Sequence, residues 1–389
     1  MITPKLALNF VSATLDPRIT FTRAGATATR VNASGLIESV AADTARFDFD
    51  PTTLVCKGLL IEEQRQNVIL NSANWTAGSW SSYTTGSATI SITAASGTAP
   101  DGTNTATKVD FNVPVSDQAF MSSNVFSVTN GLSYAGSFYA KAATGADVGK
   151  QILFRHAGAG NYTIATLTAN WVRYSSVEVA PATFTPELGI GLRPGVAGSS
   201  GAVSVLFWGA QEEAGAFVTS YIPTTSSAVT RNADVATITG SNFSSWWVAA
   251  QGGATANFRP STVSGIRPII QYDDGTANEI IALRGNTTNP ELYIVDSGTP
   301  QAQIDAGTIA ANTDYSLTGW WQTNDCRAKL GSGAQVIDNT ATIPTVTQAR
   351  IGSDGTNYLN GHIASISYYD SFTSQIYNRR KNKAIFSLM

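Results

Sequence analysis

Short runs of alternating apolar and polar residues recur along the chain, and between residues 71 and 225 no stretch shows the apolar period of a helix. Such runs include SATISITA, TATKVDFNV, SYAGSFYAKA, KQILFRHA and YTIATLTA, with turn-forming pairs such as Asp101-Gly102 and Asn130-Gly131 between them. Many short strands separated by turns are typical of antiparallel sandwiches. The sequence therefore predicts an all-β fold of tandem antiparallel jelly-roll or β-sandwich modules, with a β-rich N-terminal docking segment.

The length and charge of the chain limit the number of domains and the kinds of partner that we expect. A chain of 389 residues is too long for one ordinary core, which indicates two or three domains. Only 13% of the residues are charged, and the net charge of −3 gives no electrostatic reason to expect nucleic acid or an anionic membrane as a partner. The N-terminus lacks the pattern of a signal peptide, and no window reaches the roughly 18 apolar residues of a membrane span. We expect a soluble protein, made in a cytoplasm, without membrane insertion.

Turn signals and composition divide the chain into four parts. Residues 1–70 alternate strongly but are too short and polar for a core of their own, so we expect them to dock on a neighbouring part. Residues 71–225 are predicted to form a jelly roll, and residues 237–389 a second sandwich. Between them, residues 226–236 belong to a Thr/Ser-rich exit segment, SYIPTTSSAVTR, that we expect to be an extended, strand-free connector.

Side-chain direction can be predicted for some of these strands. Trp208, inside the run LFWGA, is expected in or near the core. Because side chains alternate between the two faces of a strand, SYAGSFYAKA should place four residues on one face, namely Tyr134, Gly136, Phe138 and Ala140.

Three stretches resemble known proteins. The series WGAQE (208–212), TSYIPT (219–224) and VTRNAD (229–234) resembles the end of carbohydrate-binding-type jelly rolls found in bacteriophage virion proteins. The stretches DPRITFTR (16–23), ATRV (28–31) and GLLIEEQR (58–65) are similar to the N-terminal region of phage virion proteins, although Gly25 stands where that pattern has serine. The C-terminal stretch ARIGSDGTNYLNGHIASISYYD resembles the closing strands of laminin-G-like or concanavalin-A-like jelly rolls, in which a short helix follows. We expect the basic stretch NRRKNK in that helix to be a solvated face.

The sequence contains few of the residue patterns that enzymes use for catalysis. His156 and His362 lie in different predicted modules, and the chain has no nucleophile elbow, phosphate loop or Cys/His cluster. Glycan cleavage needs two carboxylates facing one groove. The adjacent pairs Glu62-Glu63 and Glu212-Glu213 would point to opposite faces of a strand. We therefore predict that the chain is not an enzyme.

Cysteines and acidic residues give little sign of a resident metal. Cys56 and Cys326 lie far apart, are expected in different modules and lack metal-ligand spacing, so we expect no disulfide. No cofactor is expected, apart from calcium as one option. Oxygen ligands from sandwich loops suit calcium, and Asp273 and Asp274 are our candidates for it. The alternative is that these are turn residues beside glycine.

Aromatic residues are the candidates for sugar binding, because their rings can stack on pyranose faces. Trp75, Trp80 and Tyr83 lie in a Gly/Ser-rich loop where burial is not forced, although they could equally pack between domains. In the pairs Trp246-Trp247 and Trp320-Trp321 one ring should face the core and the other the outside or a neighbouring subunit. We take Trp247 and Trp321 as further candidates.

The resemblance and these residues together suggest a function. We predict a non-catalytic phage virion surface protein, that is, a tail fibre, spike or decoration protein that adheres to host-surface glycans and assembles with other virion proteins as a homo-oligomer, a trimer being common among virion fibres. The alternative is a purely structural capsid- or tail-decorating protein with no sugar ligand. Exposed aromatic side chains would favour adhesion, whereas aromatic side chains buried in subunit contacts would favour architecture. A polysaccharide depolymerase ranks last for want of a carboxylate pair.

Overall fold

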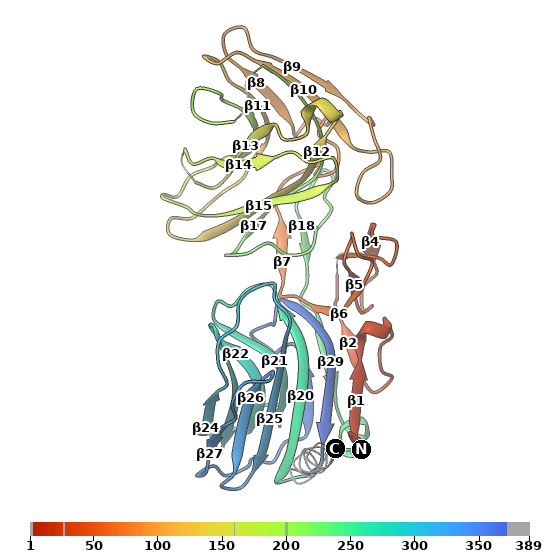
Figure 1. Cartoon of the computed structure of the whole chain (residues 1–389), viewed down its shortest axis with the longest axis vertical. Coiled ribbons are helices and arrows are strands. Elements are labelled where there is room, and N and C mark those ends of the chain that lie inside the picture. The colour runs from red at the N-terminus through yellow and green to blue at the C-terminus, as the bar shows by residue number, and fades with distance from the viewer. Residues whose placement is uncertain (1–2, 26–27, 159, 199–200, 372–389) are drawn as a thin grey trace, which may run out of the picture.

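The computed structural model describes residues 3–25, 28–158, 160–198 and 201–371. Figure 1 shows two β-sandwiches placed end to end along the long axis, which we call the upper and lower sandwich. Helical structure in the described residues consists of η1 (Phe10–Ser12), η2 (Gly145–Asp147) and α1 (Ser241–Ser244). None of these helices is long and apolar enough to cross a membrane. The predicted all-β class of tandem antiparallel sandwiches is confirmed, while the expected C-terminal helix lies outside the described residues.

The upper sandwich consists of two five-stranded antiparallel sheets. The first, the β12 sheet, has the order β15 (Val172–Val179), β12 (Ser133–Ala142), β17 (Gly201–Ala214), β10 (Thr107–Val113) and β9 (Thr89–Thr93). The second, the β13 sheet, has the order β14 (Thr163–Thr166), β13 (Gln151–Arg155), β16 (Glu187–Leu192), β11 (Ala119–Val125) and β8 (Ser81–Thr84).

Strand β12 shows how alternation places the upper core. Tyr134, Phe138 and Ala140 are buried in the core between the two sheets, as predicted. The intervening side chains, including Tyr139 and Lys141, lie on the outer face of the β12 sheet, because successive side chains on a strand point to opposite faces. Trp208 is also buried, in a smaller apolar cluster on that outer face.

The lower sandwich packs an eight-stranded sheet on a seven-stranded one. The larger sheet has the order β27 (Val336–Asp338), β26 (Cys326–Leu330), β25 (Tyr315–Gln322), β20 (Gln251–Pro260), β29 (Gly361–Tyr369), β6 (Cys56–Ile61) and β5 (Phe47–Phe49), with β1 (Leu6–Asn9) also paired to β29. The smaller sheet has the order β2 (Thr20–Thr22), β19 (Val235–Ile238), β28 (Gln348–Ile351), β21 (Ile266–Asp273), β22 (Ile280–Asn286), β23 (Asn289–Asp296) and β24 (Thr299–Asp305).

The first 70 residues contribute strands to the lower sandwich. Strands β1 and β6 both pair with β29, which lies 300 or more residues later in the chain, and β2 pairs with β19. Their apolar side chains, such as Leu6, Phe47 and Ile61, belong to the same buried core as the C-terminal strands. This segment, which we expected as a docking unit, therefore completes the sheets of the C-terminal module because it has no second sheet of its own to bury that face. Figure 1 shows β1 beside β29.

The exit segment that was expected to be strand-free contains a strand. Residues Val229–Arg231 form β18, which pairs antiparallel with β7 (Arg65–Asn67). This two-stranded ribbon joins the two sandwiches (Figure 1). The Thr/Ser composition hid the strand because its partner β7 lies more than 150 residues earlier in the chain. A hairpin of β3 (Ala28–Val31) and β4 (Ile37–Val40) lies beside this junction.

The cysteines are free thiols, although their placement differs from our expectation. Cys56 and Cys326 both pack against the core of the lower sandwich rather than lying in different modules. Cys326 is fully buried, and this burial raises the pKa of its thiol to about 12.

Candidate functional site

Two of the predicted sugar-binding tryptophans lie in the upper core. The indole of Trp75 is fully buried between the rings of Trp80 and Phe207, whose centroids lie 4.2 and 4.7 Å away. Its Nε1 donates to the carbonyl of Ser72 at 2.9 Å. The Gly/Ser-rich loop that carries these tryptophans therefore turns its rings inward, and they have no face for a sugar. Tyr83 on β8 is 51% exposed and remains the accessible member of this group.

The tryptophan pairs of the lower sandwich are also largely buried. Trp321 is 1% exposed, and Trp247 packs with its ring centroid 4.7 Å from that of Tyr272 and 6.0 Å from that of Trp321. On β25 the two rings point to opposite faces, as expected: Trp321 belongs to the lower core, whereas Trp320 does not, although it too is largely buried. The rings of Trp247 and Trp321 belong to an aromatic layer between the two lower sheets, and Trp247 lies just after the short helix α1 (Ser241–Ser244) rather than on a strand.

The predicted calcium ligands are engaged by other protein groups. The buried carboxylate of Asp273 accepts hydrogen bonds from the side chains of Gln271 and Gln348 and pairs with Arg350 Nε at 2.9 Å. Asp274 accepts from the backbone and hydroxyl of Thr276 in a turn. No group of three or more His, Cys, Asp or Glu side chains that could hold a metal ion occurs among the described residues. Calcium at this turn stays a prediction.

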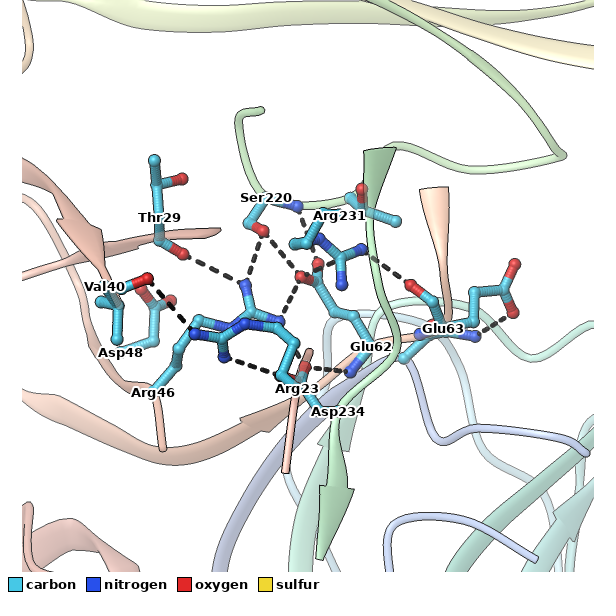
Figure 2. Close-up of polar contacts among 12 residues, drawn as sticks. Arg23, Thr29, Val40, Arg46, Asp48, Glu62, Glu63, Ser220, Arg231 and Asp234 are labelled. Atoms are coloured by element: carbon cyan, nitrogen blue, oxygen red, sulfur yellow. Dashed lines mark hydrogen bonds and ion pairs between the residues drawn. The ribbon is translucent and has the colours of Figure 1, made fainter. Parts of the chain in front are cut away.

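A buried network of charged residues lies at the junction of the N-terminal and exit segments (Figure 2). Asp234 pairs with Arg23 at 3.0 Å and with Arg46, and all three side chains are fully buried. Glu62 pairs with Arg46 at 2.8 Å and with Arg231 at 3.5 Å. We call these five residues the junction network. They come from the N-terminal segment and from the exit segment, including the GLLIEEQR and VTRNAD stretches.

The network holds the carboxylate of Glu62 ionised. Burial alone would raise the pKa of Glu62, but the guanidinium groups of Arg231 and Arg46 bring that pKa well below its usual value. The backbone N–H and hydroxyl of Ser220 also donate to the two oxygens of Glu62, each at 2.7 Å. A buried carboxylate held in this way is a structural anion, because its lone pairs are already filled by protein donors.

A cleft lies next to the network, between the β3–β4 hairpin and the outer face of the β12 sheet. It consists of a lower cavity of about 460 Å³ and an upper cavity of about 620 Å³. Four residues line both cavities, which are therefore contiguous, namely Val31, Ile37, Tyr139 and Arg173. We call the two together the junction cleft. Each of the two cavities falls in the range of roughly 300–1,000 Å³ typical of small-ligand sites.

The lower cavity contains a charged cluster of Asp48, Lys57 and His362. The carboxylate of Asp48 lies 2.5 Å from Lys57 Nζ and 2.9 Å from His362 Nε2. Burial would raise the pKa of Asp48, but the bond to His362 and the charge of Lys57 bring it to about 2. Burial lowers the pKa of His362, whose Nδ1 has no partner among the described residues. The sequence placed Asp48 on a polar strand face but could not show that this face is buried.

The upper cavity combines aromatic side chains with hydrogen-bond donors. Trp171, which is half-buried, lines it together with Tyr139, Lys141, Asn170 and Arg173. The indole Nε1 of Trp171 donates to the carbonyl of Thr98 at 3.0 Å, which fixes the orientation of the ring. Neither Trp171 nor Tyr139 was among the sequence candidates, because their exposure depends on where the distant hairpin lies.

A second polar series crosses the upper core. His156 Nδ1 lies 2.9 Å from Glu212 Oε1, and His156 Nε2 lies 2.8 Å from Ser176 Oγ. Ser176, Gly136 and Glu212 face each other across β15, β12 and β17. Because Gly136 has no side chain, the imidazole from the opposite sheet can lie over it. Burial raises the pKa of Glu212. The hydrogen bonds of His156 to Glu212 and Ser176 connect the two sheets through largely buried polar groups.

Comparisons with known proteins identify no family. No protein-family model and no curated protein matches the chain. Similar solved structures include CBM40 of the Ruminococcus gnavus IT-sialidase bound to α2,3-sialyllactose, with a TM-score of 0.29, 11% identity, and 33% of this chain and 80% of that chain covered. The tandem CBM22 domain of Paenibacillus barcinonensis Xyn10C has a TM-score of 0.26 and 9% identity, covering 78% of this chain and 95% of that chain. Mouse laminin α1 domains LG4-5 have a TM-score of 0.23 and 7% identity, covering 62% and 84%.

Proposed function

We propose that the chain is a non-catalytic protein of the bacteriophage virion surface that adheres to host glycans through the junction cleft. The observation that carries this proposal is the upper cavity, where Trp171 and Tyr139 lie beside the side-chain donors of Lys141 and Asn170. A sugar ring has apolar faces that pack on aromatic groups and hydroxyls that need hydrogen-bond partners, so this combination suits it.

The acids in the cleft support a binding role rather than hydrolysis. Glycoside hydrolysis needs a carboxylic acid whose raised pKa lets it protonate the leaving group. Asp48 and Glu62 line the lower cavity, but the pKa of each is held below its ordinary value by neighbouring cations. Neither is set up as a general acid.

The virion setting rests on the sequence resemblance of the stretches around residues 16–31, 58–65 and 208–234 to phage virion proteins. We propose a location on the virion surface, contacts with other capsid or tail proteins, and a homo-oligomeric state. Repetition of a weak glycan site on a particle would turn individually weak contacts into useful avidity.

The alternative is a purely structural virion protein, and the edge strand β15 favours it. Its outward-facing Val177 and Val179 are 45% and 59% exposed. An unpaired sheet edge with exposed apolar side chains is suited to contact with another protein.

A glycan array tests the proposal. The purified protein is presented multivalently on beads, with calcium present and with calcium chelated, which also tests the predicted calcium dependence. We expect binding to a defined glycan class that falls by at least about tenfold in Trp171→Ala. The comparison variant is Tyr83→Ala, which removes the exposed sequence candidate outside the cleft; we expect it to bind as the wild type, and binding lost in Tyr83→Ala but kept in Trp171→Ala would refute the cleft as the site. A blank array at high valency would refute adhesion and leave the structural role.

A further inference from the structure

The upper cavity is lined by cations without a carboxylate to balance them. Its lining contains two cations, Lys141 and Arg173, and no carboxylate. In the lower cavity, by contrast, Lys57 pairs with Asp48 and Arg30 pairs with Glu38. The chain as a whole has a net charge of −3, so this local excess of cations runs against its overall charge.

Lys141 is held in place by a neutral group. Its ammonium lies 5.2 Å from the ring centroid of Trp171, within the range of a cation–π contact. Such a contact orients the flexible lysine side chain without neutralising its charge. The ammonium is therefore already in position when a ligand anion binds. Binding then costs less conformational entropy, because the side chain does not have to be ordered at that moment.

Arg173 is positioned in a similar way. It donates from Nη1 to the carbonyl of Thr219 at 2.7 Å and from Nη2 to the hydroxyl of Ser137 at 3.0 Å, and it lies over the ring of Tyr139. An arginine has five N–H donors, so these two bonds leave others for a ligand. The hydrogen-bond partners of Arg173 are neutral and do not cancel its charge.

We infer that the upper cavity binds an acidic saccharide, with the sugar carboxylate between Lys141 and Arg173. Charge-assisted hydrogen bonds to a carboxylate are the stronger ones that these two side chains can make. Opposite the cations, the apolar side chains of Leu36, Ile37 and Pro100 line the cavity and can contact the apolar part of a sugar ring. A cavity of about 620 Å³ accommodates more than one sugar unit. This inference rests on the proposed glycan adhesion and specifies its ligand class.

The test uses a glycan array on which each acidic glycan is printed beside its carboxyl-reduced form, which has the same linkages but no charge. The full-length protein is compared with Lys141→Gln and with the matched control Lys329→Gln, which makes the same charge change on β26 of the lower sandwich. We expect the acidic form of at least one glycan to bind better than its reduced form, and binding to fall roughly five- to tenfold in Lys141→Gln alone. The preference should weaken as salt is raised.

The outcomes distinguish failure of the acidic ligand from failure of glycan adhesion itself. Equal binding of acidic and carboxyl-reduced forms would overturn the acidic ligand while leaving glycan adhesion intact. An equal loss in Lys141→Gln and Lys329→Gln would show that overall charge, and not this cavity, attracts the ligand, and would also overturn the inference. A blank array would refute the proposed function itself. Binding of polyphosphate or nucleic acid in place of any saccharide would show that the cavity serves a different anion.

Discussion

The junction network makes a strong prediction about stability, which Asp234→Asn tests. Asp234 is fully buried and pairs with Arg23 and Arg46, and its Oδ2 also accepts the backbone N–H of Glu62 at 2.9 Å. In the wild type, three arginines, including Arg231, face two carboxylates. The substitution leaves the three cations with Glu62 alone and turns an amide NH₂ donor toward a guanidinium. The variant therefore keeps the shape of the side chain but loses its charge.

The expected loss is large. Removing one partner of a buried ion pair costs about 3–5 kcal/mol, because the other charge stays buried without compensation. With a shift of about 2–4 °C per kcal/mol for a unit of 150–250 residues, the melting temperature of the lower sandwich should fall by roughly 6–20 °C. Calorimetry of the full-length protein measures this shift, and urea unfolding followed by tryptophan fluorescence measures the free energy of unfolding.

Asp314→Asn is the matched control. Asp314 also pairs with an arginine, Arg259, but its side chain is 75% exposed. An exposed pair contributes about 0–1 kcal/mol, so this variant should unfold close to the wild type. If Asp234→Asn and Asp314→Asn were to lose similar amounts of stability, burial would not be what makes the network strong, and the reasoning would be refuted.

Two further predictions concern the cleft and the upper core. Asp48 has a pKa of about 2 in the folded protein against an ordinary 3.8, so its contribution of roughly 2 kcal/mol is present above about pH 4 and lost as the pH falls toward 2. Urea titrations should therefore show Asp48→Asn less stable than the wild type at pH 6 but converging with it toward pH 2. A Cβ on Gly136 would lie 2.8 Å from the carboxylate of Glu212 and 2.9 Å from the ring of His156, so Gly136→Ala should destabilise the upper sandwich by about 1–3 kcal/mol. Gly145→Ala, which meets nothing within 4 Å, should leave the calorimetric transition in place.

Alternation within single strands could be predicted from the sequence, because it depends only on the geometry of an extended backbone. The inward face of β12 follows from its sequence, and so does the divergence of Glu212 and Glu213. Glu212 contacts His156 inside the upper sandwich, whereas Glu213 accepts hydrogen bonds from Thr219 of the exit segment. The all-β class follows from many such strands together.

The burial of loops and the pairing of distant segments could not be predicted in the same way. Trp75 lies among small polar residues that are compatible with a surface loop, and only the folded loop shows that its ring closes the upper core. Arg46 and Asp234 are 188 residues apart, and no local pattern links them. A polar strand face looks the same in sequence whether it faces water or a buried network. The sequence therefore indicated Trp75 and Trp80 as binding residues, whereas the cavities of the folded chain lie at the junction.

The same network that stabilises the junction also determines the shape of the cleft. Arg46 Nη1 donates to the carbonyl of Thr29 on β3, while Arg23 Nη2 donates to the carbonyl of Val40 at the end of β4. These bonds fix both strands of the hairpin, which forms one wall of the cleft, and Asp48 accepts the N–H of Val31 on the same hairpin. Buried ion pairs are costly to desolvate, so they can add little net stability, and in some proteins their role is to specify one arrangement. In this chain the arrangement they specify brings a wall from the N-terminal segment against the outer face of the jelly roll, so the binding surface that we propose exists only when both sandwiches and the exit segment are joined.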